Sequence, residues 1–111
     1  MAEPTLIEVF GAGATQSATA ITIQKADLAG LTASETNTAE SLLSAIVKKA
    51  AVNLTPTNFG TNADQSISIT PGFDSITYRL INGTQSAFLQ SAATISFAKS
   101  QTSAGITPDS Y

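Results

Sequence analysis

The chain has 111 residues with no histidine, cysteine or tryptophan, and only 12% of them are charged, whereas serine and threonine together fill 29 positions. Without cysteine and histidine it lacks thiolate chemistry, zinc–thiolate sites and the usual base that activates a serine nucleophile. Five basic residues against eight acidic ones give a net charge of −3 and no basic stripe, which argues against nucleic-acid binding. This length fits one domain, expected over 1–111, that folds without a metal or a disulfide.

The first ten residues have neither the basic start nor the apolar core of a signal peptide. No apolar stretch approaches the roughly 20 residues that a membrane helix needs. We therefore expect a protein that is made in a cytoplasm and does not bind membranes.

The N-terminal segment predicts a short helix that begins near Pro4 and ends at Gly11. We treat 1–13 as an N-terminal arm whose order depends on neighbouring molecules. The next pattern, at 18–24, alternates between apolar and polar residues, with Ile21 and Ile23 on one face, and predicts a half-buried strand.

The best helix is predicted over 37–53. Thr36 or Asn37 can cap it, and Asn37 with Glu40 resembles a capping box. An apolar stripe follows, made by Leu42, Leu43, Ile46 and Val47. The helix should end before Pro56, because the residue preceding a proline avoids helical geometry.

The segment 55–65 is expected to be a loop, and after it the apolar period changes to two. Strands are predicted at 66–70, 75–81, 84–90 and 93–99, with a turn at Pro71-Gly72 and a type I′ hairpin at Asn82-Gly83. Several apolar side chains should share the inner faces of these strands: Ile76, Tyr78, Leu80, Ile95 and Phe97.

The predicted class is α+β, with one central amphipathic helix packed on an antiparallel sheet of about four or five strands. The C-terminal tail, 100–111, has few apolar anchors, so its order should depend on a neighbour.

The eight acidic residues are scattered, and no pair stands out as a catalytic pair; they are Glu3, Glu8, Asp27, Glu35, Glu40, Asp64, Asp74 and Asp109. No S-x-x-K motif lies at a helix start, where a Ser–Lys enzyme would need it. Oxygen-bearing Asn58, Asn62 and Asp64 could approach a calcium ion, but their habit of forming turns explains the loop equally well. We therefore expect no enzyme, no cofactor, and no catalytic or metal-binding residue.

The polar residues favour contact with other proteins through an uncharged surface. Serine, threonine, asparagine and glutamine hydrogen-bond with less desolvation cost than charged groups. The outward side chains of Thr22, Thr77 and Ile81, together with open strand edges, suit pairing between subunits. We expect a homo-oligomer, a trimer in the first instance.

Four segments resemble small proteins from the structural gene clusters of tailed phages, particularly cyanophages: EPTLIEVFGAGATQ, LTASETNTAESLLSAIVKKA, TNADQSISI and ITPDSY. The resemblance covers most of the chain and lies in segment style and order, so no functional residue can be carried over. It implies a virion protein made in the host cytoplasm. The size then implies a capsid decoration (cement) protein that binds and stabilises the major capsid lattice.

Two alternatives stay open. One is another virion part, such as a tail or baseplate component. The other is a small carbohydrate-binding module, although the chain offers only Tyr78 and Tyr111 as polar aromatic platforms.

Overall fold

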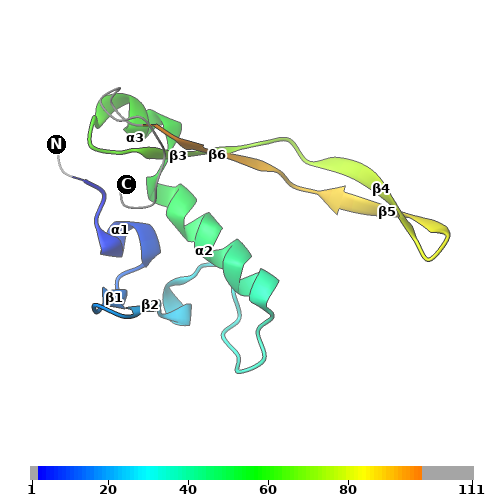
Figure 1. Ribbon diagram of the computed structural model, residues 1–111, viewed down its shortest axis with the longest axis horizontal. Coiled ribbons are helices and arrows are strands. Elements are labelled where there is room, and N and C mark those ends of the chain that lie inside the picture. Colours follow the sequence, from blue (N-terminus) through cyan, green and yellow to red (C-terminus); the bar gives the residue numbers. More distant parts are fainter. Residues whose placement is uncertain (1–2, 99–111) are drawn as a thin grey trace.

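The computed structural model describes residues 3–98. The elements in chain order are α1 (Leu6–Phe10), β1 (Thr15–Gln16), β2 (Ile21–Thr22), a 3-10 turn η1 (Lys25–Asp27), α2 (Ala39–Asn53), α3 (Pro56–Thr61), β3 (Ile67–Pro71), β4 (Ser75–Ile81), β5 (Thr84–Gln90) and β6 (Ala93–Phe97) (Figure 1). The α+β class is confirmed. The predicted tail, 100–111, lies outside the described residues.

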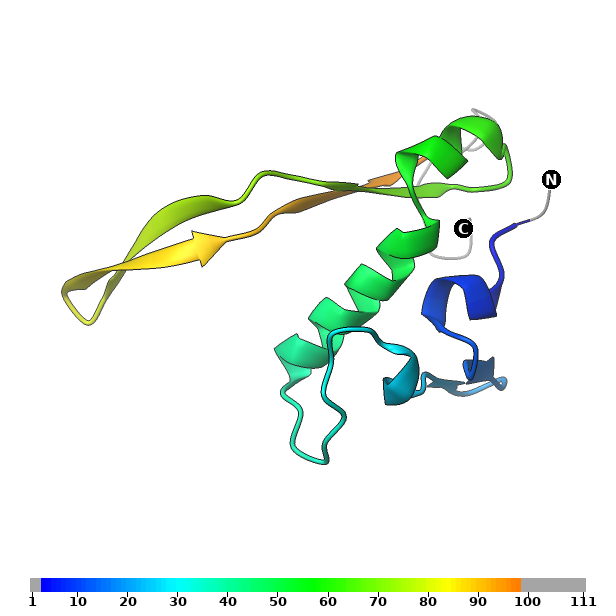
Figure 2. The ribbon, with the colours of Figure 1, turned by 180° about the vertical axis from the view of Figure 1, so that it is seen from behind.

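The strands are divided among three two-stranded antiparallel ladders: β1–β2, β3–β6 and β4–β5. Helices α1, α2 and α3 gather with the first two ladders into a body, and the β4–β5 ladder projects from it as a long arm (Figures 1 and 2). The radius of gyration is 16.9 Å, against about 13 Å for a compact chain of this length. The protein is therefore elongated, with extents of 51 × 35 × 25 Å.

Helix α1 is confirmed near its predicted bounds, and a capping box that we did not predict starts it. The Thr5 hydroxyl accepts from the Glu8 N–H while a Glu8 oxygen accepts from the Thr5 N–H. Gly11 ends the helix with a φ of +116°, a value that favours glycine. Asn53 donates its side-chain N–H to Glu8, so the described part of 1–13 lies against the end of α2.

Helix α2 ends at Asn53 as predicted, but it begins at Ala39 and is capped by Thr38, whose hydroxyl accepts from the Ser41 N–H. The capping box predicted for Asn37 and Glu40 is wrong. The Asn37 side chain instead accepts from the Ser34 N–H and donates to the Thr32 carbonyl. It thus closes the preceding loop, which is the other common use of asparagine.

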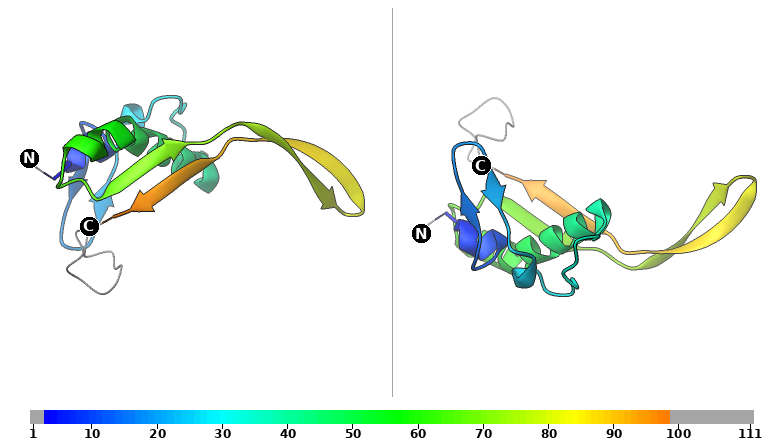
Figure 3. Two further views of the ribbon diagram at one scale, coloured as in Figure 1. Left: turned by 90° about the horizontal axis from the view of Figure 1, so that it is seen from above. Right: turned by 90° about the horizontal axis from the view of Figure 1, so that it is seen from below.

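The core is small and lies where the end of α2 meets β3. Ala50, Leu54 and Ile69 form its buried cluster, and the Ile69 N–H donates to the Leu54 carbonyl at 2.8 Å. The predicted stripe of α2 is only partly covered, since Leu42, Ile46 and Val47 are half-buried and Leu43 is exposed. Figure 3 shows why: α2 crosses the narrow β3–β6 ladder and has no broad sheet beneath it.

The predicted loop at 55–65 is wrong over its first half, where α3 forms. Pro56 occupies the first turn and Thr55 caps the helix by accepting from the Asn58 N–H. The Thr55 cap and Pro56 in the first turn outweigh the turn preference of Asn58 and Asn62. The buried Gln65 then holds the chain in place, because its amide donates to the carbonyls of Thr55 and Ile67.

The remaining strand predictions need two corrections. The strand predicted at 18–24 shrinks to Ile21–Thr22, and Ile21 is exposed. On β6, Ile95 and Phe97 lie on the predicted inner side of the ladder but stay 42% and 50% exposed. Both pair with β3 residues on the face that meets α2, but the helix covers only the β3 side of that face.

Candidate functional site

The arm is a regular β-hairpin. Seven residue pairs join β4 to β5, from Ser75 opposite Gln90 to Ile81 opposite Thr84. At its tip Asn82 has a φ of 51° and Gly83 a φ of 81°, as the predicted type I′ turn requires. The arm extends well beyond the helices, so it gains little from their packing (Figure 1). A two-stranded hairpin standing alone in water is marginally stable.

The neck of the arm carries a bulge where the chain was predicted to turn at Pro71-Gly72. Residues 72–74 on one strand face only 91–92 on the other, between the β3–β6 and β4–β5 pairings. The Gly72 N–H donates to the Ala92 carbonyl at 2.7 Å, and the Ser91 hydroxyl donates to Asp74 at 2.6 Å. A bulge increases the local twist of a ladder. The arm therefore continues from the body as a separately twisted ladder (Figure 3).

One face of the arm is apolar and uncovered. Strand alternation and register put Ile76, Tyr78 and Leu80 of β4 on the same side as Ala87 and Leu89 of β5. The four large side chains are 64% (Ile76), 65% (Tyr78), 75% (Leu80) and 76% (Leu89) exposed. We name these five residues the apolar face. Sequence alternation placed the β4 residues together, but it predicted them inside a sheet.

The opposite side of the arm, which we name the polar face, is less exposed, and its charged side chain has a partner. The Arg79 guanidinium carbon lies 4.5 Å from the centre of the Phe88 ring, which is a cation–π contact. Thr77, Ser86 and Phe88 are half-buried there. Arg79 is the only charged residue from 75 to 90, so the charge of the arm sits on this face and not on the apolar one.

Three of the eight acidic residues, Glu8, Asp27 and Asp74, act as structural hydrogen-bond acceptors, and Asp109 lies outside the described residues. Asp27 accepts the Gly13 N–H at 2.7 Å, and Asp74 accepts the Ser91 hydroxyl in the neck. The Thr5 N–H and hydroxyl, with help from Asn53 and against a small desolvation effect, lower the pKa of Glu8. Among residues 3–98, no three carboxylates gather in a group that could hold a metal ion.

The possible calcium ligands also have structural roles. The Asn58 side chain donates to the Asn53 carbonyl at 2.8 Å, which ties α3 to the end of α2. The Asn62 side chain accepts from the Asp64 N–H at 3.0 Å, which is an Asx turn. The three residues are thus placed by helix packing and turn geometry.

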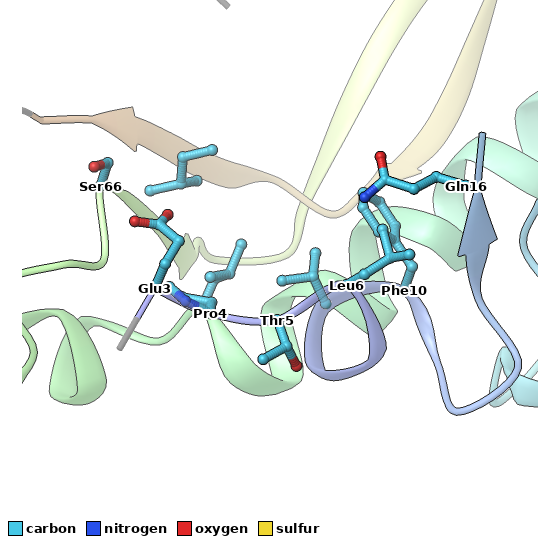
Figure 4. A pocket seen from close by; sticks show the side chains of 10 residues that line it. Glu3, Pro4, Thr5, Leu6, Phe10, Gln16 and Ser66 are labelled. Carbon is cyan, nitrogen blue, oxygen red and sulfur yellow. The ribbon is translucent and has the colours of Figure 1, made fainter. Parts of the chain in front are cut away.

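Several hollows mark the surface of the body, among them a polar one of about 220 Å³ where Glu8 and Asn53 meet α3. Two others bear on the question of a binding site. The first, of about 300 Å³, lies between the N-terminal segment and the start of β3, with Glu3 and Ser66 toward one end and Phe10 and Gln16 toward the other (Figure 4). Glu3 is its only titratable lining residue. The second, of about 580 Å³, is an apolar groove beside α2 at the base of the arm.

A comparison of the chain with protein families, curated proteins and solved structures finds no match. Within the part of the chain that the structure describes, no helix is both long and apolar enough to cross a membrane.

Proposed function

We propose that this protein is a non-enzymatic structural subunit of a larger protein assembly, and that it decorates the capsid lattice of a tailed phage. The observation that carries the first part is the apolar face, where four large side chains are each about two-thirds exposed or more on a projecting arm. Such a surface is costly to leave in water, and large exposed apolar patches mark sites of association.

The shape of the molecule favours assembly over catalysis. The larger groove beside α2 is lined mostly by apolar surface, and of its titratable lining residues Asp74 already accepts the Ser91 hydroxyl. The most unusual surface is instead the exposed apolar face of the arm. A two-stranded ladder has no concave floor in which to orient a small substrate. It does have a long face and two open edges that another protein can cover.

The second part of the proposal rests on the phage resemblance and on the low charge. The partner would be the major capsid protein or another virion protein, and the location would be the virion. Copies of a chain with few charges repel one another weakly, so they can crowd at the symmetry points of a shell. A homo-oligomer, with the trimer as the first expectation, suits such positions.

The two alternatives differ in what the arm would meet. A tail or baseplate component would use the same apolar face against a different virion protein. A carbohydrate-binding module would use the ring of Tyr78, but Ile76 and Leu80 flank that ring on the same strand and offer no hydrogen bonds to sugar hydroxyls.

The test is to add the purified protein to phage particles that lack it, and to follow genome release on heating and on osmotic shock. A decoration protein should co-sediment with the shell in a fixed ratio to the capsid protein and raise the release temperature, because it binds the lattice and not the dissociated subunits. The untreated particles are the control. Binding to isolated tails alone would favour the tail role, and equal resistance without binding would reject the proposal.

A further inference from the structure

We infer that the apolar face of the arm is covered by the same face of a second copy of this chain. This inference names the surface through which the proposed structural subunit associates with itself, and in that sense it rests on the proposed function. It also shifts the expected contact from the serine- and threonine-rich strand faces to Ile76, Tyr78, Leu80 and Leu89.

The arm needs a cover that the body does not provide. A lone hairpin is marginal in water, and no described helix or other strand packs extensively against β4 or β5. If two arms paired edge to edge, the backbone N–H and C=O groups at their open edges would be hydrogen-bonded, but the apolar faces would stay exposed to water. Face-to-face packing, as in a β-sandwich, removes them from water.

The area available is close to that of a specific contact. At the exposed fractions of 64% to 76%, the four large side chains offer roughly 550 Å² per copy, taking about 200 Å² for each large side chain. Two copies could then bury at most roughly 1,100 Å² through these side chains, which is close to the roughly 1,000 Å² threshold of a specific interface.

The chemistry of the face suits self-contact. It carries no charge, because Arg79 is held over Phe88 on the polar face, so two copies bring no like charges together. Its one polar group is the Tyr78 hydroxyl, and the amide of Gln85 borders it, opposite Leu80 on the same side of the arm. A phenol and an amide can hydrogen-bond each other across the contact.

The chain's own C-terminal segment is a poorer cover. From Lys99 to Tyr111 it contains Ile106 and Tyr111 as its only large apolar residues, too few to match four. The apolar face of a second copy, by contrast, matches the apolar area of the first. Because the same patch lies on both sides of this contact, it pairs two copies about a two-fold axis, and it therefore predicts a dimer of arms where the sequence led us to expect a trimer.

The first test measures association of the full chain by sedimentation velocity and native mass spectrometry at micromolar concentrations. The double variant Leu80→Thr/Leu89→Thr should raise the dissociation constant by about 100-fold or more, since each leucine loses its apolar burial in every copy. Threonine is a good strand former, so the arm should keep its structure. Ile81→Thr, on the polar face of the same arm, is the matched control and should change the constant little.

The second test uses the absence of cysteine, which makes single-cysteine variants clean probes. Leu80→Cys should be cross-linked between copies by a short bis-maleimide, whereas Ile81→Cys, next in sequence but on the other face, should react without linking copies. A wild-type chain that stays monomeric, equal linking of both variants, or association unchanged in the double variant would overturn the inference.

The two proposals fail in different ways. If the wild-type chain stays monomeric but still protects particles, the self-contact is wrong and the decoration role stands. If it associates through the apolar face and ignores capsids and tails, the self-contact stands and the virion role is wrong. If the truncated chain ending at Ala98 exposes the face to a fluorescent apolar dye and the full monomer does not, the C-terminal segment is the cover and the inference is overturned.

Discussion

Leu54→Ala tests whether the small contact between α2 and β3 holds the body together. Leu54 is 6% exposed and follows the last residue of α2. Its side chain packs with Ala50 and Ile69, and its carbonyl accepts the Ile69 N–H. Truncation to alanine keeps that hydrogen bond and removes only the packing, so the measured cost reports the core itself.

The expected loss is about 3 kcal/mol, within the roughly 2–5 kcal/mol found when a buried leucine becomes alanine. The starting stability should be near the lower end of the usual range, about 5 kcal/mol. Among the described residues only six apolar side chains are buried, and three of these are alanines. The variant should thus lose more than half of its stability and sit close to unfolding at room temperature.

The assay is urea unfolding followed by the circular dichroism of the helices, with the slope against urea checked for constancy. Val52→Ala is the matched control, because Val52 lies two residues away and is 70% exposed. It should change stability by less than about 0.5 kcal/mol. Equal unfolding midpoints for the two variants would refute the assignment of the core to the α2–β3 contact.

Three further predictions concern the hairpin, the N-terminal helix and the tail. Gly83→Val should destabilise the arm by at least about 1 kcal/mol, because a β-branched residue fits a positive φ poorly, and amide exchange should quicken in β4–β5 but not in α2. Hydrogen bonds from Thr5 lower the pKa of Glu8 in the folded state. The ionised carboxylate therefore adds to the free energy of unfolding above the ordinary carboxyl pKa, and this stabilisation is lost as pH falls through the folded pKa. Glu8→Gln should remove that pH dependence, which acid unfolding measures. A chain truncated after Lys99 should unfold at nearly the same temperature as the full chain but bind phage particles more weakly, and equal binding would exclude a role for the tail in attachment.

The sequence determined the local elements well. The helix end before Pro56, the hairpin at Asn82-Gly83 and the strands at 75–81 and 84–90 agree with the structure within a residue or two. These features depend on backbone preferences and on hydrogen bonds between near neighbours, which the residue types carry with them. Caps were harder: Thr38 replaces the expected Asn37, because both can accept from the first turn and the loop around Asn37 decided between them.

The sequence also predicted which residues of β4 share a face of the arm. Alternation placed Ile76, Tyr78 and Leu80 on one face and Arg79 on the other, as observed. Alternation predicts which side chains share a side of a strand, but it does not predict what packs against that side. It could therefore not show that this face stays exposed. The apolar face therefore looked like core in the sequence.

Only the tertiary structure decided that the expected sheet divides into three ladders and that one ladder leaves the body. That outcome depends on contacts between residues far apart in the chain, such as the Ile69–Leu54 hydrogen bond that docks β3 on α2. It also depends on the bulge at 72–74, which twists the next ladder away from the helices. Burial is a property of the whole arrangement, so a pattern typical of core became a surface once nothing in the described chain packed against it.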